Sequence, residues 1–316
     1  SIIRTMFNRQ ATGNSGLLSG CVAVVLGVLL LLNACQSSPT APTLGGPEPS
    51  PPAISTDALI ATSTSTAAPA PTQTNAPTPT ATQCQARTGT LASVQFESAL
   101  LGREVYMRIY FPPCYTAQSE KPYPVLYLLH GLEGDETQWE SLGLAEELDR
   151  LIEVGTAEPM LVVMPRETDT KGYPHSDFPQ VFIEELVPFI DSHYTTQTER
   201  SGRMIGGISR GASWALRIGV GNYAMFSKVG LHSLPLEFDE GNEWAAELAA
   251  LEPEDRPALF LDSGHRDKDI DFTRSFEWAL TTAGIPHTWY LFSGYHNEAY
   301  WSEHLPIYLE WYAQGS

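Results

Sequence analysis

One serine of the sequence stands in a setting that could make it a nucleophile. The stretch MIGGISRGASWAL places Ser209 between Gly207 and Gly211, with one residue separating it from each glycine. A short apolar run precedes it and a helical pattern follows. At such a strand-to-helix turn the hydroxyl is exposed above the sheet, small neighbours allow the strained backbone, and the helix N-terminus favours developing negative charge. We therefore interpret Ser209 as a nucleophile; the alternative is a glycine turn that packs a helix on a strand.

A nucleophilic serine needs a base, and the base needs an acid that orients it. When the serine lies on a turn of this kind, the acid and then the histidine follow it in the chain, each expected just beyond an apolar strand. The segment ALFLDSGHRDKD offers three carboxylates, and TWYLFSGYHNEAYW with the residues after it offers two histidines. The candidates are Asp262, Asp267 and Asp269 for the acid, and His296 and His304 for the base.

The hydrophobic pattern predicts the elements that would position these groups. Residues 103–111 alternate apolar and polar side chains, which indicates a strand with one solvated face. Helical patterns alternate with four continuously apolar runs, and one helix is expected to bend at Pro188. Strands that helices cover on both faces have such runs, which are residues 125–129, 160–164, 258–261 and 288–292. Antiparallel strands followed by alternating strands and helices predict an α/β domain with a mainly parallel sheet and helices on both faces.

Four motifs, in their order along the chain, resemble one known family. The segments YLLHGLEGDETQW, GGISRGAS, LDSGHRD and SGYHNEAYW together are similar to the esterase-D-like "putative esterase" family of α/β-hydrolases. That family includes feruloyl and acetyl-xylan esterases, enterochelin esterases, S-formylglutathione hydrolases and mycolyltransferases. The resemblance extends from about Glu97 to the C-terminus and implies the α/β-hydrolase fold.

The resemblance also implies which residues form a catalytic triad with Ser209. The acid falls three residues after the glycine of SGHRD, at Asp267, and the base falls on His296. Asp262 would then have a structural role at the end of a strand. Asp269 is the alternative acid, and His304 is expected on the closing helix.

The LLHG turn of the family implies an oxyanion hole, whose donors here would be the backbone amides of Leu132 and Arg210. His130, just before this turn, is interpreted as a buried imidazole that holds the loop by hydrogen bonds. Family members commonly carry Met or Gln where this chain has Arg210. The cationic side chain is therefore expected to alter the pocket or to favour an anionic substrate.

Three aromatic residues lie beside these motifs and could line an acyl or aromatic pocket or belong to the core: Trp139, Tyr300 and Trp301. Residues 165–178 follow a strand without periodicity, and we expect them at the mouth of the site. The segment HRDKDID has enough carboxylates for a weak calcium site, but we interpret it as a solvated loop. The sequence predicts no metal and no cofactor.

The first 35 residues resemble the signal segment of a bacterial lipoprotein. A basic stretch precedes the 11-residue apolar run VAVVLGVLLLL, which has the length of a signal-peptide core and is short for a membrane span of roughly 20 residues. The run ends in LNAC, similar to a lipoprotein cleavage box with Cys35 as the lipidated residue, although Asn33 departs from the usual pattern. LSGC at residues 18–21 fits the box better but precedes the run. An uncleaved signal anchor is the alternative, and both predict a membrane-tethered protein at the bacterial cell envelope or surface.

Residues 36–83 and 84–316 differ sharply in composition. The former are rich in Pro, Thr, Ser and Ala with almost no charge, which is typical of a disordered linker or a glycosylated stalk. The latter have the size of one compact catalytic domain. Cys84 and Cys114 are its only cysteines, and in an exported domain we expect them to form a disulfide, with a free buried pair as the alternative.

Together these features predict an exported serine carboxylesterase that cleaves an acyl ester, for instance of a carbohydrate, through an acyl-enzyme. An acyltransferase with the same triad stays open, because the two activities differ only in whether water or a sugar hydroxyl reaches the acyl-enzyme. A non-catalytic binding module is a third hypothesis, which the complete triad disfavours. The formal net charge of −19 argues against a nucleic-acid partner, because phosphate binding requires a basic surface. The pattern gives no indication of the oligomeric state.

Overall fold

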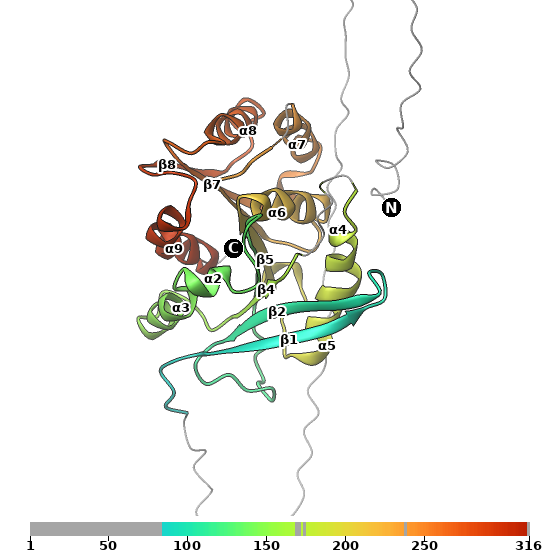
Figure 1. Ribbon diagram of the computed structural model, residues 1–316, viewed down its shortest axis with the longest axis vertical. Coiled ribbons are helices and arrows are strands. Elements are labelled where there is room, and N and C mark those ends of the chain that lie inside the picture. Colours follow the sequence, from blue (N-terminus) through green and yellow to red (C-terminus); the bar gives the residue numbers. More distant parts are fainter. Residues whose placement is uncertain (1–83, 168–171, 173–174, 237–238, 315–316) are drawn as a thin grey trace, which may run out of the picture. The chain divides into compact units, whose positions relative to one another are not determined.

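The computed structural model describes residues 84–167, 172, 175–236 and 239–314. Residues 1–83, with the predicted signal segment, Cys35 and the linker, lie outside the described residues. The described strands form one sheet in the order β1-β2-β4-β3-β5-β6-β7-β8 (Figure 1). The strands are β1 (Thr90–Ser98), β2 (Arg103–Phe111), β3 (Val125–Leu129), β4 (Leu161–Pro165), β5 (Arg203–Ile208), β6 (Lys228–His232), β7 (Ala258–Gly264) and β8 (Thr288–Phe292).

The sheet is parallel from β4 to β8, and the antiparallel pairs β1·β2 and β2·β4 lie at its other end. This confirms the predicted α/β-hydrolase architecture, with antiparallel strands preceding a mainly parallel sheet. The carboxyl ends of parallel strands meet at one edge of a sheet, where ligands of α/β proteins bind. The turns that follow β5, β6, β7 and β8 therefore lie next to one another.

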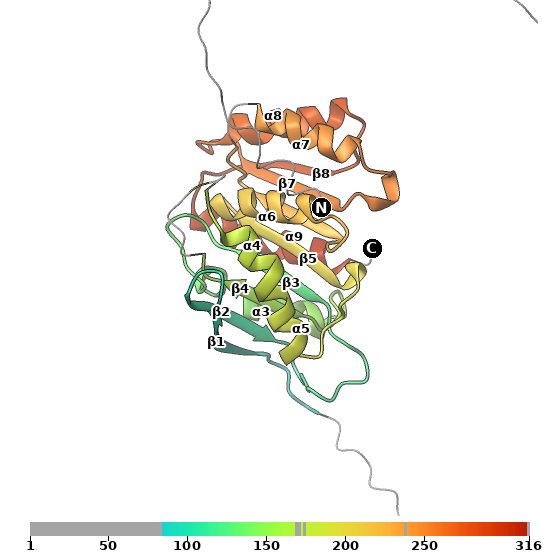
Figure 2. The ribbon, with the colours of Figure 1, turned by 90° about the vertical axis from the view of Figure 1, so that its right-hand side faces the viewer.

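Helices cover both faces of the sheet (Figure 2). They are α2 (Gln138–Ser141), α3 (Leu144–Glu153), α4 (Phe178–Val181), η1 (Phe182–Leu186), α5 (Val187–His193), η2 (Arg200–Gly202), α6 (Arg210–Gly221), α7 (Glu240–Ala249), η3 (Pro253–Asp255), α8 (Ile270–Thr282) and α9 (Glu298–Ala313). Helices α3 and α9 pack on one face, and α4 to α8 on the other. None of the helices in the described part of the chain is long and apolar enough to cross a membrane.

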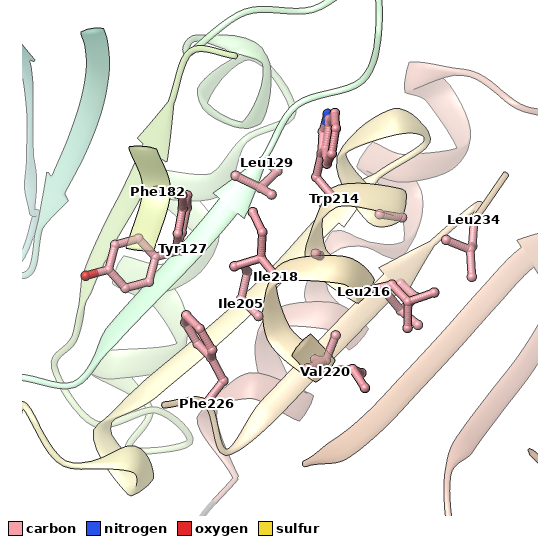
Figure 3. Close-up of a cluster of buried hydrophobic side chains, with 14 of the residues drawn as sticks. Tyr127, Leu129, Phe182, Ile205, Trp214, Leu216, Ile218, Val220, Phe226 and Leu234 are labelled. Carbon is pink, nitrogen blue, oxygen red and sulfur yellow. The ribbon is translucent and has the colours of Figure 1, made fainter. Parts of the chain in front are cut away.

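Two buried hydrophobic clusters correspond to these two faces. On one face the apolar side chains of α6 pack against those of β3 and β5, as Figure 3 shows for Trp214 and Ile218 beside Leu129 and Ile205. On the other face the side chains of α3 and α9 pack against alternate residues of the same strands. All five residues of β3 are buried, which explains why its sequence VLYLL has no polar position.

Strand β8 corrects one prediction from the hydrophobic pattern. Its run TWYLF is as apolar as that of β3, yet β8 forms an edge of the sheet and none of its residues is fully buried. Tyr290 and Leu291 are 42% and 48% exposed. Apolar runs therefore located the strand but did not distinguish a central strand from an edge strand.

The helix around Pro188 contains a wide turn where a bend was expected. The segment is α-helical in α4, π-helical in η1 and α-helical again in α5, with Pro188 as the second residue of α5. Proline has no N–H to donate and its ring crowds the preceding turn. The π-helical turn directly before the proline accommodates this local mismatch.

Candidate active site

Ser209 lies at the turn between β5 and α6 with a backbone conformation that few residues other than glycine adopt. Its φ and ψ are 54° and −126°, and its N–H donates to the carbonyl of His232 at 2.9 Å. A Cβ on Gly207 would come within 2.3 Å of the Gly211 backbone, and a Cβ on Gly211 within 2.2 Å of the Leu129 carbonyl oxygen. The two glycines of the motif are therefore required because α6 packs directly against β3 and β5.

His296 lies in the loop between β8 and α9 and contacts the nucleophile directly. Its Nε2 is 2.8 Å from the Ser209 Oγ, a distance at which the hydroxyl donates to the imidazole. The loop is fixed by Asn297, whose side chain caps α9 by accepting a hydrogen bond from the Tyr300 N–H at 3.0 Å. The indole of Trp301 stands edge-on to the imidazole, with 5.2 Å between the ring centroids.

Asp267, in the loop after β7, orients this imidazole. Both of its carboxylate oxygens accept from His296 Nδ1, at 2.8 and 2.9 Å, and one also accepts from the Asp269 N–H at 2.8 Å. Burial alone would raise the pKa of Asp267, but the hydrogen bonds from His296, Asp269 and the Ser233 hydroxyl lower it below its usual value. Asp267 is therefore ionised at neutral pH, and the neutral His296 carries its proton on Nδ1.

The other two acid candidates have different surroundings. Asp269 lies 3.6 Å from His296 Nδ1 and pairs with the exposed ammonium of Lys268. Asp262 is completely buried at the end of β7 and contacts no member of the triad. Its carboxylate accepts from the hydroxyls of Tyr300 and Tyr308, at 2.6 and 2.7 Å, and pairs with His232 at 2.7 Å.

The loop that follows β3 presents backbone amides beside Ser209. The carbonyl of Gly131 accepts from His130 Nδ1 at 2.7 Å and from the Gly134 N–H at 3.1 Å, while His130 Nε2 accepts from the Glu167 N–H at 2.9 Å. Burial lowers the pKa of His130, which favours the neutral tautomer that these bonds require. Because a trans peptide directs its C=O and N–H oppositely, the Leu132 N–H points away from His130.

A side chain from the next helix holds the same loop. Gln138 Oε1 accepts from the Gly131 N–H at 2.8 Å, so that this amide is already occupied. Leu132 is 67% exposed, and Arg210 is the first residue of α6, directly after Ser209. The geometry is compatible with the two predicted oxyanion donors.

The triad opens into a cavity of about 530 Å³ whose wall has both polar and apolar surface. Its lining residues are Gly131, Leu132, Glu133, Gln138, Ser209, Lys268, His296, Asn297, Glu298 and Trp301. Of the three aromatic residues singled out from the sequence, only Trp301 lines it. Trp139 and Tyr300 are 1% and 2% exposed and belong to the core, which is one of the two roles that the sequence left open; Trp301 belongs to the same buried cluster.

The side chain of Arg210 turns away from the triad. Its guanidinium pairs with Glu167 at 2.8 Å and lies 5.8 Å from the ring centre of Trp214. Glu167 is part of the segment that we expected at the mouth of the site, and four residues before Gly172 and two after it lie outside the described residues. The Arg210 charge is thus balanced by a carboxylate, which weakens the argument for an anionic substrate.

The residues that support the triad from behind could not be identified from the sequence. Ser233 contacts both Asp267 and Trp301, and His232 contacts Ser209 through its carbonyl. Neither belongs to a recognisable motif. The one available signal was their position at the end of β6, the strand beside β5 that the nucleophile follows.

Among the described residues, one group has the geometry to hold a metal ion. Ligand atoms of Asp267, Asp269 and His296 lie within 4.8 Å of one another. His296 Nδ1 already donates to Asp267, so a metal bound there would replace the hydrogen bond that orients the imidazole. The arrangement therefore fits proton transfer better than metal ligation.

Comparisons with known proteins agree with this geometry. The family model described as "Putative esterase" matches residues 98–312. An endo-1,4-beta-xylanase/feruloyl esterase of Xylanibacter ruminicola is 30% identical over 208 residues, which are 62% of this chain and 27% of that protein. An esterase of Mycobacterium tuberculosis is 25% identical over 247 residues, 61% of this chain and 52% of that protein. The chain thus spans between a quarter and about half of the length of these relatives.

Solved structures share the fold of the described residues. A ferulic acid esterase superposes with a TM-score of 0.64 at 25% identity, over 72% of this chain and 98% of its own. An S-formylglutathione hydrolase of Staphylococcus aureus superposes with a TM-score of 0.58 at 19% identity, over 72% and 99% of the two chains.

Proposed function

Because the chain belongs to the "putative esterase" family, we propose that it is a serine hydrolase of carboxylic esters, with Ser209 as nucleophile, His296 as general base and Asp267 as the orienting acid. One observation carries this proposal: the continuous chain of hydrogen bonds from Asp267 through His296 to Ser209, with both links to the imidazole at 2.8 Å. The chain of bonds ends at a cavity wide enough for an acyl ester. No part of it requires a cofactor.

The proposed reaction proceeds through an acyl-enzyme. His296 Nε2 accepts the Ser209 proton while Oγ attacks the ester carbonyl, and the imidazolium then gives that proton to the leaving alcohol. Water repeats the sequence in the second half: it loses a proton to His296, attacks the acyl carbon and releases the acid, and Ser209 regains its proton. The ionised Asp267 stabilises the imidazolium in both halves.

The amides of Leu132 and Arg210 would stabilise the oxyanion of each tetrahedral intermediate. Removing one such donor in a comparable enzyme costs about 3 kcal/mol of transition-state stabilisation. Three contacts hold the loop before Leu132 in place: those of His130, Gln138 and Gly134 with Gly131. Donors fixed in this way need no rearrangement when charge develops.

The substrate we propose is an acyl ester of a carbohydrate, such as a feruloyl or acetyl ester. The names of the relatives support the acyl part, and the amide and carboxylate groups in the cavity wall suit a hydroxylated alcohol. We expect the described domain to release ferulate from methyl ferulate and 4-nitrophenol from 4-nitrophenyl acetate, followed by absorbance and chromatography. Failure to hydrolyse either ester would contradict the proposal. Adding a sugar acceptor separates the alternatives, because an acyltransferase would form an acylated sugar at the expense of free acid.

We further propose that the protein is exported and tethered to the bacterial cell envelope through Cys35. The disulfide between Cys84 and Cys114 supports an oxidising compartment. In a bacterial host, replacing Cys35 by Ser in the full chain should move the protein from the membrane fraction to the soluble or secreted fraction. Replacing Cys21 by Ser is the matched control and should leave the distribution unchanged. Membrane association that survives the Cys35 substitution would argue for an uncleaved anchor instead of a lipid.

A further inference from the structure

His232, the last residue of β6, and Ser233, which follows it, lie behind the triad, although neither takes part in proton transfer. The His232 carbonyl accepts from the Ser209 N–H at 2.9 Å and so fixes the turn that carries the nucleophile. The hydroxyl of the next residue, Ser233, is near enough to the Asp267 carboxylate to help lower the pKa of that group. It also reaches the wall behind His296, because Trp301 Nε1 donates to the Ser233 Oγ at 3.0 Å.

Ser233 has an uncommon conformation for a residue with a side chain. It is completely buried and its φ is +54°, in the left-handed region that glycine adopts most easily. Its N–H donates to the Asp262 carbonyl at 2.9 Å, which holds the strained backbone in place. A glycine at position 233 would adopt this conformation without strain. The hydroxyl is therefore what the serine contributes at this position.

The hydroxyl has one proton and two lone pairs, and the structure uses them in different directions. The oxygen accepts from Trp301, whose indole stands edge-on to the His296 imidazole. The proton remains for the nearby Asp267 carboxylate, whose pKa the hydroxyl helps to lower. One buried group thus lies beside both the carboxylate that orients the imidazole and the ring that packs against it.

The residue before Ser233 gives this contact a rigid base. His232 is completely buried, its Nδ1 pairs with Asp262 at 2.7 Å, and its Nε2 lies 3.2 Å from the hydroxyl of Tyr312. Tyr308 stacks on its ring with 3.8 Å between centroids. The backbone that leads into Ser233 is therefore held by side chains from both β7 and α9.

We propose that Ser233 is a positioning residue of the active site, whose hydroxyl holds the Asp267 carboxylate and the Trp301 indole in register with His296. The proposal rests on the ester hydrolysis proposed above. Ser233 does not touch the substrate, so its loss should affect the rate of the chemical step and leave binding in the cavity nearly unchanged.

Two substitutions separate this role from a purely structural one. Ser233→Ala removes the hydroxyl and keeps the strained backbone, whereas Ser233→Gly removes the hydroxyl and relieves the strain. We expect both variants to lower kcat by about 10- to 100-fold with KM within about threefold of the wild type, since small misplacements of catalytic groups have effects of this size. Because glycine relieves the backbone strain, the glycine variant should nevertheless have a higher Tm than the alanine variant.

The matched control is Ser263→Ala on the adjacent strand β7. Ser263 is also completely buried, but its hydroxyl lies 3.4 Å from the carbonyl of Gly264, and kcat should stay within about twofold. Wild-type kcat in the glycine variant, or a loss of activity that follows Tm across all three variants, would overturn the positioning role. A wild type that hydrolyses no ester would overturn the proposed function as well, so the two failures are distinguishable.

Discussion

Replacement of Ser209 by alanine is expected to lower kcat for ester hydrolysis by about 10⁶-fold, the loss measured when the nucleophile of a comparable triad enzyme is removed. The hydroxyl is the group that His296 contacts at 2.8 Å and that would form the acyl-enzyme in the proposed reaction. Alanine keeps a Cβ at a position whose φ is 54°, so it adds no backbone strain beyond that of serine, and the fold should persist. Initial rates with 4-nitrophenyl acetate measure the loss, and circular dichroism checks the fold.

A covalent probe gives a second readout of the same substitution. A fluorophosphonate should add one adduct to the wild type, seen as a single mass increment of the intact protein, and none to Ser209→Ala. Ser213→Ala is the matched control one turn along α6, because the Ser213 hydroxyl donates to the Pro235 carbonyl and not to His296. An adduct on the Ser209 variant, or near-wild-type hydrolysis by it, would assign the nucleophile to another residue.

The second large effect is expected from Asp267→Asn, which should lower kcat by about 10⁴-fold. Asparagine is nearly the same size but cannot balance an imidazolium, and its amide can hold the wrong tautomer of His296. The reduction should appear in kcat at all pH values above the pKa of Asp267, because the wild-type carboxylate is ionised throughout that range.

Asp269→Asn provides the matched control two residues away. Its carboxylate is 3.6 Å from His296 Nδ1 and pairs with Lys268, so we expect kcat to fall by no more than about threefold. If the Asp269 variant lost more activity than the Asp267 variant, Asp269 would be the acid of the triad in place of Asp267. The kcat values of the two variants therefore distinguish between Asp267 and Asp269, the two candidates for the acid of the triad.

The sequence predicted those parts of the site that short segments determine. Gly207 is required because a Cβ there would come within 2.3 Å of the Gly211 backbone in the same strand-turn-helix unit, and Gly211 because a Cβ would meet the end of β3, so the spacing of the two glycines is visible in the sequence. The acid of the triad could not be identified in this way. Three carboxylates follow the same strand, and the residue pattern alone gave no choice among them until the family resemblance favoured Asp267.

Residues whose roles depend on distant contacts could not be assigned from the sequence. Tyr300 and Trp301 are neighbours on α9 and both are buried, but a helix turns by about 100° per residue, so only Trp301 also reaches the wall of the cavity. Ser233 reaches Asp267 and Trp301 across 34 and 68 positions of the chain. No local pattern marks such a residue. The exposure of β8 could not be predicted either, because the composition of a strand does not reveal its position in the sheet.

The steric fit around the nucleophile also limits how this protein could be redesigned. Within GISRG, the two glycines have no room for a Cβ, Ile208 is completely buried, and Ser209 is the proposed nucleophile. Arg210 is the one residue of the motif whose side chain, 20% exposed, extends beyond the packed turn, and every replacement except proline would keep its backbone amide. Position 210 is thus the place within the motif where a substitution disturbs the packed turn least, at the cost of the ion pair with Glu167.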